Sequence, residues 1–168
     1  MEKYRTFWKR LLSAIIDSII FIPFSYFGIK IEQINNKTIL FCWLFLYACL
    51  IIFYSVYLNG RYGQTLGKKV MNIIVLDVSE SKMIGFKHAF YRDATPFIFY
   101  LIGIFFVIST SINNPTYNID QLNTQYDDFI FYATLVWVII ELLTMLTNPK
   151  RRAVHDILAQ SVVVDLSR

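Results

Sequence analysis

The chain has 168 residues, 56% of them hydrophobic and 17% aromatic, and a positive mean hydropathy of +0.48. This composition leaves too little polar surface for a soluble domain. It predicts a single compact membrane domain over residues 1–168, of the all-α class. The net charge of +4 follows from where the basic residues lie along the chain, so it does not indicate nucleic-acid binding.

Four apolar runs have about the 20 residues that a helix needs to cross a bilayer. The expected transmembrane helices are residues 11–31, 39–58, 94–112 and 129–147. The basic N-terminus followed by an apolar run also resembles a signal peptide. However, no small-residue cleavage site follows, and Pro23, Tyr26 and Phe27 occupy the place where one would lie. We therefore expect the first helix to be retained.

The basic residues predict the orientation of the four helices. Fourteen Lys and Arg residues precede the first helix, follow the fourth, or lie between the second and third, whereas Lys30 and Lys37 alone lie on the other side. Basic residues in short loops stay on the cytoplasmic side. Both termini are thus expected in the cytoplasm, together with residues 59–93 and 148–168, which form a small cytoplasmic cap.

Two carboxylates interrupt the apolar runs. Asp17 lies in the first run and Glu141 in the fourth, each about 9 Å from the predicted inner boundary at 1.5 Å per residue. A carboxylate inside a membrane is costly and often marks a functional site. We predict a polar pocket that they share with further residues at or near that depth, namely Ser13, Ser55, Arg92 and Asp93. Alternatively, each carboxylate pairs separately with a nearby arginine and holds the helices together.

The segment between the second and third helices contains three features. Residues 60–69 are rich in glycine and lysine, but the spacing G-x-x-x-G-K is one residue short of a nucleotide-binding loop. We expect a tight turn instead, with Lys68 and Lys69 facing anionic lipid. The β-branched residues 70–78 predict a short strand, and residues 84–93 predict an interfacial helix that leads into the third span.

The C-terminal segment has a basic cluster followed by His155 and Asp156. Histidine and aspartate can both bind a metal ion, but His88 is the only other histidine, so no metal site is predicted. We expect a cytoplasmic helix in which Asp156 pairs with a basic residue, with Arg151 and Arg152 contacting lipid or the cap. Residues 160–164 predict a second strand that pairs with the first.

Catalytic motifs are missing from the sequence. It contains no G-x-S-x-G motif and no H-E-x-x-H motif. No cysteine is placed near a residue that could act as a general base. Cys42 and Cys49 are about 10.5 Å apart along a helix, too far for a disulfide within it. We therefore predict neither an enzyme nor a bound cofactor.

Arg10, Asp17, the segment Gly63-Gln-Thr-Leu-Gly-Lys-Lys and the tail Arg151-Arg-Ala-Val-His-Asp-Ile-Leu-Ala together resemble the RDD family of bacterial membrane proteins. The likeness spans nearly the whole chain. It implies that Arg10, Asp17 and Asp156 are the arginine and two aspartates for which the family is named. It also implies a bacterial inner-membrane protein, for which transport of unknown ligands is the usual suggestion.

Two functions remain open at this point. In the first, the intramembrane carboxylates bind a proton, a cation or a small solute for transport, and four helices would then need to oligomerise to form a path. In the second, the protein is a membrane scaffold that recruits a protein partner or anionic lipid, and the charges only hold the helices together.

Overall fold

The computed structural model describes residues 2–114 and 116–167. After a 3-10 turn at Glu2–Tyr4, the elements are α1 (Phe7–Glu32), α2 (Lys37–Tyr62), α3 (Leu66–Val70), β1 (Ile73–Asp77), α4 (Gly85–Asn113), α5 (Ile119–Thr147), α6 (Val154–Leu158) and β2 (Ser161–Asp165). Within the described residues, α1, α2, α4 and α5 are long and apolar enough to cross a membrane. They confirm the predicted all-α membrane protein with four spanning helices.

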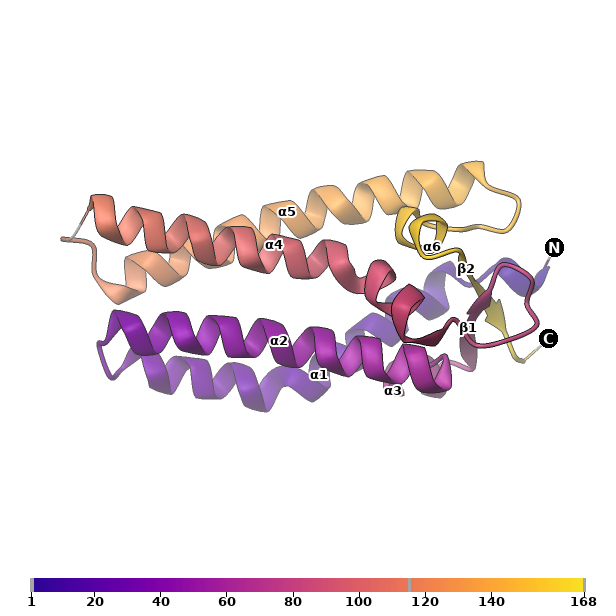
Figure 1. The fold of residues 1–168 in the computed structure, drawn as a ribbon, viewed down its shortest axis with the longest axis horizontal. Coiled ribbons are helices and arrows are strands. Elements are labelled where there is room, and N and C mark those ends of the chain that lie inside the picture. Colours follow the sequence, from indigo (N-terminus) through magenta and orange to yellow (C-terminus); the bar gives the residue numbers. More distant parts are fainter. Residues whose placement is uncertain (1, 115, 168) are drawn as a thin grey trace.

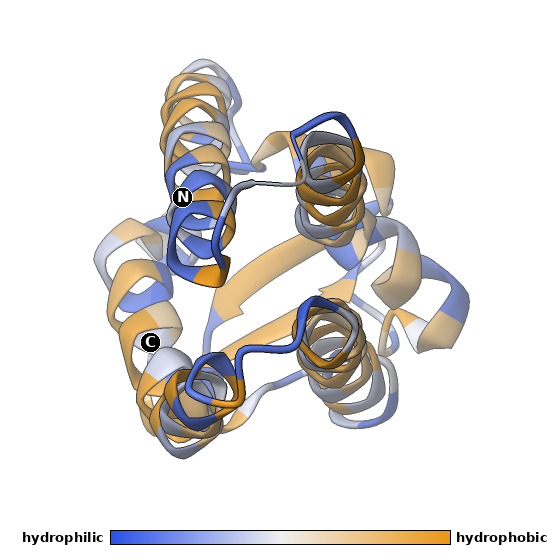
Figure 2. Cartoon of the chain, turned by 90° about the vertical axis from the view of Figure 1, so that its left-hand side faces the viewer, coloured by the Kyte–Doolittle hydropathy of each residue, from blue (hydrophilic) through white to orange (hydrophobic). Residues whose placement is uncertain are grey.

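The four long helices run side by side along the length of the molecule (Figure 1). Both termini, α3, α6 and the two strands lie at one end of this bundle, which we call the sheet end. The connections from α1 to α2 and from α4 to α5 lie at the opposite end, the loop end. Figure 2 looks along the bundle from the loop end and shows the four helices around its axis, with the apolar strands behind them.

All four long helices are longer than the sequence predicted. Asn36 caps α2, since its side chain accepts hydrogen bonds from the N–H groups of Thr38 and Ile39. Asn118 and Gln121 form a capping box that starts α5 at Ile119, so the predicted start of the fourth helix at residue 129 is wrong. The polar residues of 119–128 form the first turns of this helix instead.

The expected boundary between an interfacial helix over residues 84–93 and a span over residues 94–112 is also wrong. Both belong to the single helix α4, which contains Pro96. Proline lacks the N–H that residue 96 would donate to the carbonyl of Arg92, but the helix continues on both sides. The charged residues Arg92 and Asp93 are therefore fixed rigidly to a spanning helix.

The two strands pair in antiparallel register, from Ile73 opposite Asp165 to Asp77 opposite Ser161. The predicted strand pairing is confirmed. Ile73, Val75 and Val163 are fully buried and pack against Ile84 and Ala89 at the start of α4. The two-stranded sheet thus joins residues 161–165 to residues 73–77.

The chain folds as two similar halves. In each half, two long helices are followed by a five-residue helix, a two-residue turn and a five-residue strand. The residues before α3 and α6, Thr65 and Ala153, have nearly the same backbone angles (φ −75°, ψ 173° and φ −75°, ψ 171°). Asn72 and Gln160, which precede the strands, both have positive φ (55° and 49°). Such agreement indicates an internal structural repeat.

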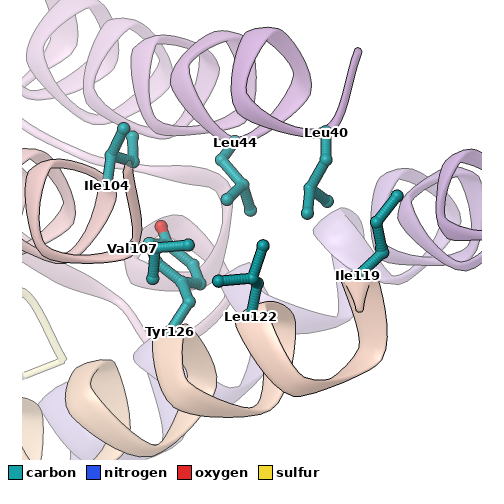
Figure 3. Packing of buried hydrophobic residues seen from close by; sticks show 7 residues of the cluster. All are labelled: Leu40, Leu44, Ile104, Val107, Ile119, Leu122 and Tyr126. Carbon is teal, nitrogen blue, oxygen red and sulfur yellow. The ribbon is translucent and has the colours of Figure 1, made fainter. Parts of the chain in front are cut away.

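The bundle interior is packed unevenly. The main apolar cluster contains residues of α2, α4 and α5, namely Leu40, Leu44, Ile104, Val107, Ile119, Leu122 and Tyr126 (Figure 3). Among the described residues, α2 and α4 have the most extensive contact, and α1 is held mainly by α3. Many large apolar side chains, such as Phe53, Phe105 and Phe131, are exposed on the long helices, as expected of a surface that faces lipid.

Candidate functional site

Asp156 is the centre of a buried ion cluster at the sheet end. Its side chain is fully buried; Oδ2 lies 2.5 Å from Nη1 of Arg10, and Oδ1 lies 3.1 Å from Nη1 of Arg92. The two arginines come from α1 and α4, which are the first helices of the two halves. Burial raises the pKa of the Asp156 carboxyl, but Arg10, Arg92 and His155 lower that pKa to well below its ordinary value. Asp156 is therefore ionised at neutral pH and ties α1, α4 and α6 together.

His155 extends this cluster to α5. Its Nδ1 hydrogen-bonds to Oε1 of Glu141, and its Nε2 lies 3.0 Å from Nη2 of Arg92 and 3.3 Å from Oδ1 of Asp156. Because Glu141 accepts at Nδ1 and Arg92 donates at Nε2, these contacts fit a neutral imidazole protonated on Nδ1. If Nε2 also gained a proton, it would donate to Oδ1 of Asp156 and could no longer accept from Arg92.

The pKa of His155 reflects opposing influences. Burial lowers it and so does Arg92, whereas the charge of Asp156 and the hydrogen bonds to Asp156 and Glu141 raise it. The net result is a pKa above the ordinary value of histidine. His155 is thus a proton-binding group inside the cluster.

Asp17 lies in a separate set of hydrogen bonds. The hydroxyl groups of Tyr54 and Thr65 donate to it at 2.7 and 2.6 Å, and the N–H of Gly67 donates at 2.8 Å. Its partners belong to α2 and α3, whereas Glu141 hydrogen-bonds to α6. The structure therefore gives these two carboxylates different partners rather than one shared pocket.

Gly67 explains why α3 approaches α1 so closely. A Cβ atom at this position would collide with the carbonyl oxygen of Ser13 and would lie 3.0 Å from the carboxyl carbon of Asp17. Ser13 itself is buried, and its hydroxyl donates to the carbonyl of Arg10 at 2.7 Å. Only glycine allows the N–H of residue 67 to reach Asp17.

Lys68 points into the protein and not toward lipid, which corrects the sequence-based expectation. Its Nζ donates to Oδ1 of the fully buried Asn59 at 2.8 Å. The amide of Asn59 donates in turn to Asp93 at 3.3 Å, and the hydroxyl of Ser55 donates to the same Asp93 oxygen at 2.7 Å. Lys69 is exposed, and its contact with anionic lipid stays a prediction.

The pKa of the Lys68 amino group is shifted strongly. Burial and the charge of Arg92 lower this pKa to about 7, although Asp93, Asp17 and Asp156 act in the opposite direction. The amino group therefore exchanges a proton near neutral pH. Its hydrogen-bond partner Asn59 is bonded in turn to Ser55 and Asp93.

The remaining predicted residues contact the cap. Nε of Arg152 donates to the carbonyl of Ser161 at 2.9 Å, and Nη2 donates to that of Asp156 at 3.1 Å. The carbonyl of Arg151 accepts from Nη2 of Arg10 at 3.4 Å. Among the described residues, no three His, Cys, Asp or Glu side chains are grouped closely enough to hold a metal ion.

Sequence reasoning missed Tyr54, Asn59 and Thr65, and it had set His155 aside after considering it as a metal ligand. Thr65 lies inside the motif that contains Gly67, which is a signal that was available. The prediction placed Asn59 at the start of the cytoplasmic segment 59–93, although it is a polar residue one turn beyond Ser55. Its partners Lys68 and Asp93 lie on α3 and α4, 9 and 34 residues away in the sequence.

Among curated proteins and solved structures, the chain has no significant match. The model of the RDD family matches residues 4–160, which is nearly the whole chain. The matched region includes Arg10, Asp17 and Asp156, the residues by which the sequence resembled that family. Two of these, Arg10 and Asp156, form an ion pair, and the third holds α3 against α1. The chain belongs to the RDD family.

Proposed function

We propose that this protein transports a small monovalent cation in exchange for a proton, and that the cation binds where the Lys68 amino group now lies. The proposal places the sheet end in the cytoplasm of a bacterial cell, in the inner membrane. The basic residues that the structure describes on that side of the bundle support this orientation, since positive loops stay inside. The proposal assigns the protein no enzymatic reaction.

The observation that carries the proposal is the environment of Lys68. An ammonium group and an alkali cation both seek oxygen ligands, and this ammonium group contacts Oδ1 of Asn59 next to the carboxylate of Asp93. When Lys68 loses its proton, the oxygen of Asn59 and the neighbouring Asp93 no longer face an ammonium group. A cation that enters then replaces the charge that left, so binding and proton release are linked.

The Asp156 cluster has a different role in this proposal. Arg10 and Arg92, one from each half, are held by one carboxylate and so fix the two halves beside the Lys68 site. Asp17 positions α3 through Gly67 and Thr65, and therefore positions Lys68 itself. These residues support the site without binding the cation.

The direct test is thermal unfolding of the detergent-purified protein in Na⁺, K⁺, Li⁺ and Mg²⁺ at pH 6 and pH 8. A ligand at one hundred times its Kd stabilises the folded state by about 2.7 kcal/mol. We expect one monovalent cation to raise the unfolding temperature at pH 8 and much less at pH 6, where Lys68 keeps its proton. Asp93→Asn should lose this rise, while Lys69→Met, on the exposed side of α3, should keep it.

The hydrogen bonds of Asp17 favour a second candidate, a membrane scaffold whose intramembrane charges only hold helices together. Asp17 accepts three hydrogen bonds from α2 and α3, and such polar contacts do join membrane helices. A scaffold would recruit a protein partner, a second copy or anionic lipid through its basic sheet end. If no cation shifts the unfolding temperature at either pH, the transport proposal fails and the scaffold is favoured.

A further inference from the structure

The hydroxyl group of Tyr126 is buried inside the bundle without a hydrogen-bond partner in the described part of the chain. The side chain is only 4% exposed and is surrounded by apolar residues such as Ile104, Val107 and Leu122. Figure 3 shows its oxygen pointing into the bundle, close to Val107. A buried hydroxyl that bonds to nothing costs stability, so this one needs a partner such as water.

The absence of a side chain at Gly103 makes room for the ring of Tyr126. A Cβ atom at Gly103 of α4 would lie 3.1 Å from Cε2 of Tyr126 and 3.1 Å from Cδ1 of Phe129. Glycine at position 103 therefore makes room for the tyrosine ring between α4 and α5. A phenylalanine would fill that space equally well, so packing alone does not explain the hydroxyl.

Other hydroxyl groups lie in the same part of the bundle. Tyr100 and Tyr47 are close enough to interact with Tyr126 electrostatically, and the hydroxyl of Tyr47 lies 3.2 Å from that of Ser25. At 1.5 Å per residue, Tyr126 and Ser25 lie about 10 Å from the loop end, Tyr47 about 15 Å and Tyr100 about 20 Å. The four residues thus span depths of about 10 to 20 Å, and each of the four long helices contributes one.

Titratable groups lie at both ends of this series. At the loop end, the side-chain amide of Asn123 donates hydrogen bonds to Glu32 at 2.7 Å and to Asp127 at 3.4 Å. Asp127 directly follows Tyr126 in the sequence. At the other end, Tyr54 lies two turns beyond Tyr47 on α2 and donates to Asp17.

One aromatic ring separates the two parts of the series. The ring of Phe21 is perpendicular to that of Tyr47, with centroids 6.3 Å apart, and to that of Tyr54, with centroids 5.3 Å apart. It therefore lies between the hydroxyls of the loop-end half and the Tyr54–Asp17 pair. An apolar ring at this position interrupts a chain of hydrogen bonds.

We propose that Tyr126, Tyr100, Tyr47 and Ser25, with bound water, form a hydroxyl track that carries protons between Asp127 and Glu32 at the loop end and Asp17 near the sheet end. Each hydroxyl accepts a proton on its oxygen and passes its own hydrogen onward. After the transfer, each hydroxyl therefore carries one proton, as it did before. Phe21 closes the track, and movement of its ring opens it. A metal cation needs several oxygens at one point, whereas these four residues are spread over about 10 Å of depth, so the track suits protons.

The track is tested with protein in liposomes that contain a pH-sensitive dye, under a membrane potential set by K⁺ and valinomycin. We expect proton entry faster than in empty liposomes. Tyr126→Phe should lower it to the rate of empty liposomes, although the ring and the packing remain. Tyr132→Phe is the matched control, because Tyr132 is 63% exposed on the same helix. It should leave the rate unchanged, and Phe21→Ala should raise it.

Two results would overturn the track: proton entry in the wild type no faster than in empty liposomes, or equal rates in the wild type and Tyr126→Phe. Unfolding temperatures of each variant show whether a lost rate reflects lost folding. The track goes beyond the proposed cation site, and the two fail separately. A cation-induced rise in unfolding temperature without proton entry contradicts only the track. Proton entry that depends on Tyr126, without any cation effect, contradicts only the cation site.

Discussion

Asp156 shows how a buried charge is tolerated in this protein. Its carboxylate has no exposure, and it is opposed by Arg10 and Arg92 from two helices that are distant in the sequence. Such an arrangement contributes little net stability relative to apolar residues, but removing one partner leaves the others unpaired. The cluster therefore fixes how the helices are arranged.

The substitution Asp156→Asn should destabilise the protein strongly, by about 3–5 kcal/mol, because two arginines lose their counter-charge. Thermal unfolding in detergent measures the effect. Asp77→Asn is the control, since Asp77 lies at the end of β1 and binds only nearby residues such as Ser79 and Ser81. Equal unfolding temperatures for Asp156→Asn and wild type would show that the cluster does not hold the helices.

His155 should make stability depend on pH in a defined direction. Because its pKa is raised on folding, the folded protein binds the proton more tightly than the unfolded chain does. The resulting stability is complete below pH 6.5 and is lost as pH rises through the folded pKa. The difference in unfolding temperature between wild type and His155→Asn should therefore fall from pH 6 upward. A difference that grows with pH would contradict this assignment.

Lys68 should act in the opposite direction. Its pKa of about 7 lies below the ordinary 10.5, so between these values the unfolded chain holds a proton that the folded protein lacks. Stability then rises with pH across this window. Wild type should gain unfolding temperature relative to Lys68→Met from pH 7 to pH 10. For Lys69→Met, a substitution of the exposed neighbour, the difference in unfolding temperature from wild type should not change with pH. If the difference for Lys68→Met is also independent of pH, the Lys68 amino group is not desolvated.

Only some of these residues can be predicted from the sequence. Asp17 and Glu141 are visible because they interrupt apolar runs. Lys68 and Lys69 are adjacent and chemically identical, and which one points inward depends on how α3 packs against α1 through Gly67. That contact joins residues far apart in the chain, and no local pattern reveals it.

At the scale of elements, the strands and the C-terminal helix around Asp156 were predictable, and the short helix α3 was not. Residues 73–77 and 161–165 are rich in β-branched residues, which indicate strands. The five-residue helices α3 and α6 are too short to be stable by themselves, so their conformation depends on tertiary contacts. The sequence does not reveal the repeat that contains them either, because equivalent positions carry different residues. Lys68 in α3, for example, corresponds to the oppositely charged Asp156 in α6.

Gly67→Ala tests how α3 is attached to α1. The added methyl group would meet the backbone carbonyl of Ser13, which cannot move as a flexible side chain can. We expect a loss of about 1–3 kcal/mol in the free energy of unfolding, as for other overpacked sites. Leu66→Ala, at an exposed position of the same helix, should cost less. Comparable losses for the two variants would mean that this close approach is not required.

At the scale of the whole molecule, the four spans follow from the apolar runs, but their arrangement does not. Core-facing and lipid-facing residues of membrane helices are equally apolar, so the extensive contact between α2 and α4 has no counterpart in the sequence pattern. For the same reason, the sequence pattern does not predict that Arg10 and Arg92 both contact Asp156. These arginines join the two halves of the molecule beside the Lys68 site.

The most direct test of the proposed exchange is to add the cation that stabilises the protein to a weakly buffered detergent solution at pH 7 and measure the proton released. The account predicts that wild type releases a proton as the cation replaces the Lys68 ammonium, and that Lys68→Met releases none. If no proton is released although the cation binds, or if Lys68→Met releases as much as wild type, the cation and the ammonium do not compete and the account is wrong.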